Sequence, residues 1–211
     1  MSNAIIFDFD GTLVDSEKAI YECFQSITSR LAPERENYAK NILIGPPLRD
    51  TALEILGTKN QKLLDKFVKS FIAMHDEQVI RHTQPYPDAI QVLEKLYAKN
   101  ISMAVATNKR LAPTQKLMDH FGWNEYFSSI ECNDSQPEMR NKDAMIQDII
   151  NQNQIFQGSY FVGDTVNDGL SANLNQLPFI KACYGYGRDQ DWSKVTIHQE
   201  IHQFIEILEL I

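Results

Sequence analysis

The sequence predicts an α/β fold in which parallel strands alternate with helices and a helical segment is inserted after the first strand. Short apolar runs recur along the chain, and stretches of helical length separate them, which is typical of a parallel α/β sheet. Residues 16–80 break this alternation, because their apolar side chains recur at helical spacing. We therefore expect a sheet domain made of residues 1–15 and 81–211, and a helical cap domain made of residues 16–80.

The elements follow from these patterns in chain order. The expected strands of the sheet comprise residues 5–7, 101–106, 129–131, 160–162 and 179–182. The expected helices between them comprise residues 87–99, 113–121, 141–152 and 166–175, with Pro113 in a first helical turn. Apolar residues at helical spacing predict a terminal helix over about 196–210.

Composition restricts the possible partners and surroundings. The chain has 211 residues, 43% of them hydrophobic, and a formal net charge of -8, which argues against binding nucleic acid or an anionic membrane. The three cysteines, Cys23, Cys132 and Cys183, are too scattered for a disulfide framework or a zinc site. This cysteine usage suits a reducing compartment, and the sequence has no apolar run of membrane-spanning length, so we expect a cytoplasmic protein. We expect a monomer or a homodimer.

Two carboxylates, Asp8 and Asp10, directly follow the first apolar run. Side chains two residues apart on an extended segment point to the same face. At about 4 Å two such charges repel by about 4 kcal/mol for an effective dielectric constant of about 20. A cation, a shared proton or a substrate must offset this repulsion, and we expect a divalent metal ion. Gly11 permits a tight turn, and the Thr12 hydroxyl can face phosphate oxygens. The alternative is an ordinary Asp-rich turn.

Further polar residues end two later strands. Thr107 ends the second strand and is followed by Asn108 and Lys109, which suits either a phosphate-binding turn or an ordinary polar turn. Asp164 and Asp168 follow the fourth strand, where carboxylates either bind a metal or act as partners of a helix dipole. In open α/β sheets, ligands bind at the edge formed by the carboxyl ends of the strands. All these residues follow such strand ends, so we expect them to share one site.

Taken in this order, the motifs resemble those of the haloacid dehalogenase superfamily, in particular its phosphoglycolate phosphatase-like branch. The resemblance covers the whole chain. It implies a Rossmann-like core with an inserted helical cap, and Mg²⁺-dependent transfer of a phosphoryl group to an aspartate.

The resemblance also implies roles for the acidic residues. Asp8 is expected to be the nucleophile that forms an aspartyl-phosphate, and Asp10 the general acid and base. The Mg²⁺ ligands are expected from Asp8, the backbone carbonyl of Asp10, Asp164 and, directly or through water, Asp168.

The resemblance implies that phosphate and substrate are bound by a second group of residues: Gly11, Thr12, Thr107, Asn108 and Lys109, together with Arg49 of the cap. Arg49 could equally be a solvated arginine at a helix start. His75 and His82 are expected at the surface, and Trp123 and Trp192 in packing roles.

One departure concerns the site lysine. Members of the superfamily often carry it before a proline, but this chain has Gln136-Pro137 there. Lys142 is the candidate replacement, with Arg140 as the alternative.

The function expected from the resemblance is hydrolysis of a small phosphorylated metabolite. Two alternatives are a phosphosugar mutase of the beta-phosphoglucomutase type and a non-catalytic protein that binds a phosphorylated ligand.

Overall fold

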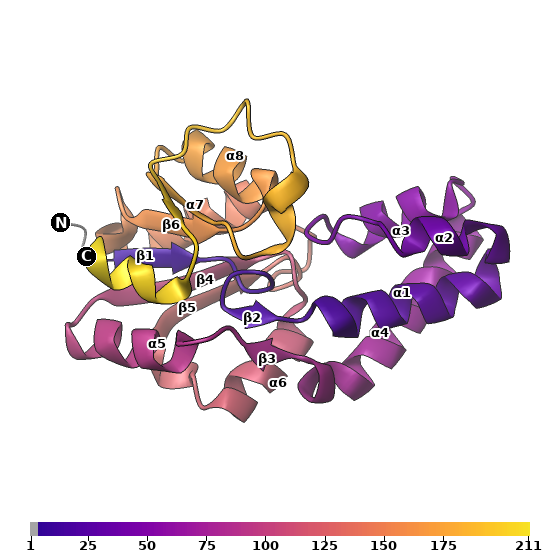
Figure 1. The fold of residues 1–211 in the computed structure, drawn as a ribbon, viewed down its shortest axis with the longest axis horizontal. Helices are drawn as coiled ribbons and strands as arrows, with labels where there is room; N and C mark the ends of the chain where they lie inside the picture. The colour runs from indigo at the N-terminus through magenta and orange to yellow at the C-terminus, as the bar shows by residue number, and fades with distance from the viewer. Residues whose placement is uncertain (1–3) are drawn as a thin grey trace.

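The computed structural model describes residues 4–211, in which six parallel strands form one sheet with helices on both faces (Figure 1). Its strands are β1 (Ala4–Phe7), β4 (Ser102–Thr107), β5 (Phe127–Cys132), β6 (Tyr160–Gly163), β7 (Phe179–Ala182) and β8 (Gln199–Ile201). Their order across the sheet is β5-β4-β1-β6-β7-β8, and every neighbouring pair is parallel. The predicted α/β fold is therefore confirmed, with each predicted strand present to within two residues.

Two pairs of helices cover the two faces of the six-stranded sheet. The four helices are α5 (Ala89–Ala98), α6 (Leu111–Phe121), α7 (Lys142–Gln152) and α8 (Val166–Leu174). In the central strand β1, Ile5 and Phe7 pack with α5 and α6, whereas Ala4 and Ile6 pack with α7 and α8. Successive side chains of a strand point to opposite faces of the sheet. Because helices cover both faces, all four side chains of β1 must be apolar, as they are.

Helices α1 to α4 form a second body beside the sheet (Figure 1). They are α1 (Glu17–Leu31), α2 (Glu36–Ala39), α3 (Leu48–Leu56) and α4 (Gln61–His82). Their shared core is apolar, and in it Phe24 packs against Phe67 and Phe71 at ring-centroid distances of 6.2 and 5.0 Å. We refer to these four helices and the segments that join them as the cap. Its exact boundaries at residues 16 and 80 remain a prediction.

Short elements complete the chain. Strands β2 (Val14–Asp15) and β3 (Gln84–Pro85) pair antiparallel where the chain enters and leaves the cap. The short 3₁₀ helices are η1 (Pro33–Arg35), η2 (Asn124–Tyr126), η3 (Gln154–Phe156), η4 (Tyr186–Asp189) and η5 (Phe204–Glu209). No helix of the described chain is long and apolar enough to cross a bilayer.

The terminal helix predicted over 196–210 is wrong. Strand β8 and the 3₁₀ helix η5 occupy this stretch instead. The edge of β7 supplies backbone partners, and the Cys183 N–H donates to the Ile201 carbonyl at 2.8 Å. Ile201, Phe204 and Ile207 are still buried against the sheet, so the apolar spacing correctly indicated burial but not one continuous helix, because only Phe204–Glu209 is helical, as a 3₁₀ helix.

Candidate active site

Three carboxylates meet at the carboxyl edge of the sheet. Asp8 follows β1, Asp164 follows the neighbouring strand β6, and Asp168 lies in the first turn of α8. All three are buried, and one oxygen of each lies within 4.8 Å of the others. The parallel sheet thus brings together residues that are more than one hundred and fifty positions apart in sequence.

Lys142 neutralises part of this cluster. It is the first residue of α7, whose start is capped by the Asn141 side chain accepting from the Ala144 N–H at 2.9 Å. Its Nζ lies 2.7 Å from Asp8 Oδ1 and also forms an ion pair with Asp168. Of the two cations considered from sequence, the structure brings Lys142 to the cluster. The alternative, Arg140, instead pairs with Glu131 at 2.6 Å and with Asp148.

The electrostatics of the cluster fit a divalent cation. Burial raises the pKa of Asp8 to about 7, although the Lys142 ammonium opposes this shift. Burial also raises the pKa of Asp164 well above its usual value, and the nearby charges of Asp168 and Asp8 add to the effect. Burial alone would lower the pKa of Lys142, but the carboxylates of Asp168 and Asp8 raise it. One ammonium among three buried carboxylates leaves negative charge on oxygen donors, which is the donor set that Mg²⁺ prefers.

Asp168 is engaged mainly within the protein. Its Oδ2 accepts hydrogen bonds from the Thr165 N–H at 2.9 Å and the Thr165 hydroxyl at 2.6 Å, forming a capping box at the start of α8. Its Oδ1 meets Lys142. Protein contacts thus occupy both oxygens of Asp168, and through them Asp168 positions Lys142 and the loop.

Gly11 and Thr12 lie against Asp164. Gly11 has φ +84°, and a Cβ there would lie 2.3 Å from Asp164 Oδ2, so the position requires glycine for both conformation and space. The Thr12 hydroxyl donates to Asp164 Oδ1 at 3.3 Å. Sequence reasoning missed a third contact, the Tyr186 N–H, which donates to Asp164 Oδ2 at 2.6 Å. The same rule would have found it, because Tyr186 also lies after the carboxyl end of a strand, β7.

Asp10 is held by other partners than the three clustered carboxylates. Its oxygens lie 3.0 and 3.1 Å from Lys109 Nζ, and the Ser16 hydroxyl donates to Oδ1 at 2.6 Å. Ser16 is itself held by Tyr186, whose phenol oxygen accepts from the Ser16 N–H at 2.8 Å. Lys109, expected to bind substrate, therefore fixes the orientation of Asp10 in this structure.

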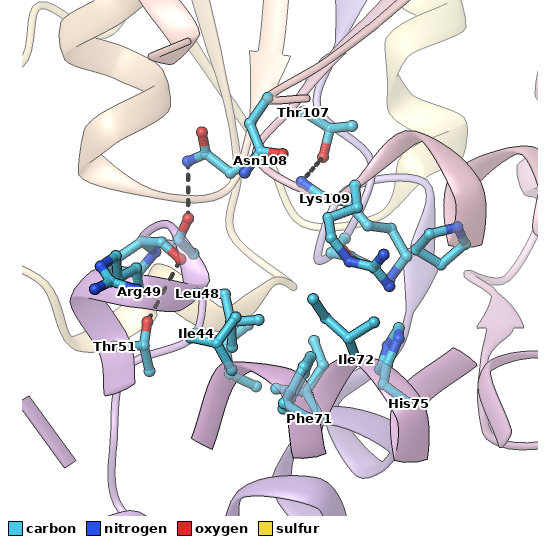
Figure 2. Close-up of a pocket in the computed structure, with 18 of the residues that line it drawn as sticks. Ile44, Leu48, Arg49, Thr51, Phe71, Ile72, His75, Thr107, Asn108 and Lys109 are labelled. Carbon is cyan, nitrogen blue, oxygen red and sulfur yellow. Dashed lines mark hydrogen bonds and ion pairs between the residues drawn. The ribbon is translucent and has the colours of Figure 1, made fainter. Parts of the chain in front are cut away.

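Thr107 and Asn108 connect the sheet edge to the cap. The Thr107 hydroxyl oxygen accepts from the Lys109 N–H at 3.1 Å. Asn108 Nδ2 donates to the carbonyl of Gly45, in the cap, at 2.9 Å (Figure 2). The Asn108 side chain thus binds the cap in this structure.

A pocket of about 320 Å³ lies between the sheet edge and the cap (Figure 2). Asp8, Asp10 and Lys142 line it on the side of the sheet, and apolar residues of the cap line the other side. Arg49 also lines it, but its guanidinium donates to Asp65 at 2.8 Å and to Gln61 at 2.5 Å. The structure therefore places Arg49 at the pocket with its charge already paired.

The expectation that His75 lies at the surface is wrong. His75 is 3% exposed, lines the pocket and stacks on Phe71 at 5.2 Å, because it lies one helical turn after Phe71 on the inner face of α4. Burial, with the positive charges of Lys109 and Arg110, lowers its pKa far below the usual 6.5. His82 is half-buried beside Glu22, at 3.2 Å.

The two tryptophans have packing roles. Trp123 is fully buried against Phe9 and Phe121, and Trp192 stacks on Phe179.

Comparison with known proteins agrees with this architecture. The family model described as haloacid dehalogenase-like hydrolase matches residues 5–182. A phosphoglycolate phosphatase of Agrobacterium fabrum is 28% identical over 196 residues, covering 88% of this chain and 82% of that protein. A 5'-nucleotidase of Pseudomonas aeruginosa is 24% identical over 213 residues, covering 98% and 92% respectively.

A solved structure shares the fold. It is a haloacid dehalogenase-like family hydrolase of Streptococcus pneumoniae, which superposes with a TM-score of 0.82 at 22% identity, over 99% of this chain and 98% of that one. The family model covers most of the chain, including the acidic motifs at both ends of the site. The chain therefore belongs to the haloacid dehalogenase-like hydrolase family.

Proposed function

We propose that this hydrolase is a Mg²⁺-dependent phosphatase that removes the phosphoryl group from a small phosphomonoester through an aspartyl-phosphate on Asp8. The reaction chemistry would be that of a phosphoglycolate phosphatase-like enzyme. The observation that carries the proposal is the setting of Asp8, which lines the pocket while Lys142 and two further carboxylates surround it. The names of the relatives, phosphoglycolate phosphatase and 5'-nucleotidase, support the reaction class.

In the first step, an Asp8 oxygen attacks phosphorus, and the bond from phosphorus to the substrate oxygen breaks. The departing alkoxide takes a proton from Asp10, which lines the same pocket. In the second step, Asp10 accepts a proton from water as the water oxygen attacks phosphorus, and the bond to Asp8 breaks. Inorganic phosphate leaves, and both aspartates return to their starting states.

The cations reduce the repulsion between an anionic nucleophile and an anionic phosphoryl group. The Lys142 ammonium contacts Asp8 directly, and Asp168 holds that ammonium in place. Asp8 and Asp164 would hold the metal, with the Asp10 carbonyl as a further ligand. When bound, Mg²⁺ supplies positive charge that stabilises the phosphoryl oxygens during transfer.

Phosphate release from benzyl phosphate and phosphoglycolate, with Mg²⁺ or with EDTA, tests the proposal. We expect Mg²⁺-dependent release that falls at least about a thousandfold in Asp8→Asn. Asp191→Asn, which changes an exposed aspartate in the same way, should match the wild type. After acid quenching, mass spectrometry of the wild type during turnover should show one added phosphoryl group, absent from Asp8→Asn.

Other outcomes would contradict the proposal. Full activity in Asp8→Asn would exclude the aspartyl-phosphate. Isomerisation of a sugar phosphate without phosphate release would indicate a mutase, and ligand binding without turnover would indicate a binding protein.

A further inference from the structure

The wall of the pocket that faces Asp8 is apolar. Cap residues from α1, the segment before α3, α3 and α4 line it: Ile20, Phe24, Ile44, Leu48, Phe71 and Ile72. Figure 2 shows Ile44, Leu48, Phe71 and Ile72 on the side of the pocket opposite the sheet edge. A phosphoryl group on Asp8 would leave the rest of the substrate against this wall. The leaving group is thus the part of the substrate that the cap contacts.

Among the described residues, each arginine and lysine that lines this pocket forms an ion pair with a carboxylate of the protein. Arg49 binds Asp65, and Arg110 binds Asp76. Lys109 and Lys142 bind the site carboxylates on the other side of the pocket.

His75 does not supply a positive charge in place of these cations. It is buried, and its lowered pKa leaves it uncharged near neutral pH. A second negative charge on the substrate would therefore have to displace a carboxylate from one of these cations or be desolvated without an ion-pair partner, which is costly in an apolar pocket.

The size of the pocket suits a compact leaving group. An apolar cavity of about 150 Å³ is large enough to bind benzene in another protein. The volume here is about 320 Å³, which leaves room for one ring-sized group together with a phosphoryl group.

We propose that the substrate carries its phosphoryl group on an uncharged, mainly apolar alcohol of about single-ring size, and not on a carboxylate-bearing alcohol such as glycolate. This inference rests on the proposed phosphatase activity. The proposed substrate differs from phosphoglycolate, which the names of several relatives specify. The proposed reaction at the acidic residues of the sheet edge stays the same.

The test compares kcat/KM for benzyl phosphate, phosphoglycolate and a nucleoside 5'-monophosphate. Acetyl phosphate serves as an activated probe, because its acetate leaving group departs readily without help from the cap. Benzyl phosphate and phosphoglycolate both release an unactivated alkoxide, so their ratio reports contacts with the leaving group. We expect kcat/KM for benzyl phosphate to exceed that for phosphoglycolate and for the nucleotide by at least about tenfold.

Variants on α4 connect this preference to the pocket. Ile72→Ser should lower the ratio of benzyl phosphate to phosphoglycolate efficiency by about tenfold or more, because Ile72 lines the pocket. Ile80→Ser is the matched control, since Ile80 lies two turns further along the same helix and is 39% exposed. Taking the ratio within each variant cancels a change in the fraction of folded enzyme, and Leu48→Ser provides a second pocket variant.

The outcomes separate the two proposals. Asp8-dependent hydrolysis of acetyl phosphate combined with a preference for phosphoglycolate would overturn the apolar leaving group and leave the phosphatase intact. An unchanged ratio in both Ile72→Ser and Leu48→Ser would also overturn it. If even acetyl phosphate is not hydrolysed, the phosphatase proposal fails and this inference fails with it.

Discussion

Replacing His75 by phenylalanine should make the protein less sensitive to acid. The His75 ring is buried and stacks on Phe71 with an interplanar angle of 13°, a contact that a phenylalanine ring can keep. Its Nε2 has no hydrogen-bond partner among the described residues. Protonation would therefore place an unsolvated charge beside Lys109 and Arg110, which explains the strongly lowered pKa of the folded state.

The magnitude follows from linkage. In the unfolded chain the histidine binds a proton below its usual pKa of 6.5, whereas in the folded protein it stays neutral. The unfolded state binds more protons in this window, so the histidine lowers the free energy of unfolding as pH falls below 6.5. Between the usual pKa and pH of about 5 the interval is about 1.5 pH units, and at 1.36 kcal/mol per unit the loss is about 2 kcal/mol.

Urea unfolding near pH 7.5 and near pH 5 measures this difference. The fall in unfolding free energy on acidification should be about 2 kcal/mol smaller in His75→Phe than in the wild type. Asp8, with a raised pKa, changes stability in the opposite direction over this range, but it does so in both proteins and cancels in the comparison. His120→Phe, which changes an exposed helical histidine, should leave the pH dependence unaltered. An identical acid response in His75→Phe and the wild type would refute the reasoning.

Three further changes probe the site. Gly11→Ala should lower the melting temperature and kcat far more than Gly158→Ala. Both glycines have positive φ, but of the two only Gly11 would place a Cβ within 4 Å of other atoms among the described residues. Equal effects of the two substitutions in thermal melts and assays would contradict this steric argument. Asn108→Ala removes a hydrogen bond to the Gly45 carbonyl and should raise KM more than it lowers kcat, by about threefold to tenfold, in steady-state assays; an unchanged KM would show that this contact does not hold the cap. Lys142→Met removes the ammonium from a buried carboxylate cluster and should cost about 3–5 kcal/mol of unfolding free energy in EDTA, measured by urea titration; a loss below about 1 kcal/mol would contradict the pairing.

The closeness of the acidic side chains is the part of the candidate site that position along a strand predicts. The carboxyl ends of β1 and β6 are adjacent because parallel strands align, so the proximity of Asp8 and Asp164 follows from topology alone. The choice between Lys142 and Arg140 could not be made in this way. It depends on which side of the α7 start each side chain occupies and on a competing partner of Arg140, Glu131 in β5.

Side-chain direction and tertiary pairing set the limits of the prediction. Asp10 follows the same strand as Asp8, yet it turns toward Lys109, which lies 99 positions away in sequence. His75 has the polarity of a surface residue, and only the helical turn that it shares with Phe71 indicates its burial. For Asp10 the deciding contact is between elements whose relative placement no local pattern specifies, whereas for His75 it lies within one helix.

The cap both forms the pocket and is held by contacts to the sheet domain. Asn108 binds the Gly45 carbonyl, and Arg110 binds Asp76 of α4, so the apolar wall exists in this form only while the cap lies against the sheet edge. A leaving group that contacts this wall binds the closed arrangement better than an open one, and therefore shifts the population toward it. Closure also removes water from the space in front of Asp8, which strengthens the electrostatic effect of Lys142. Recognition of an apolar leaving group and activation of the nucleophile would then be two consequences of the same contact between cap and sheet.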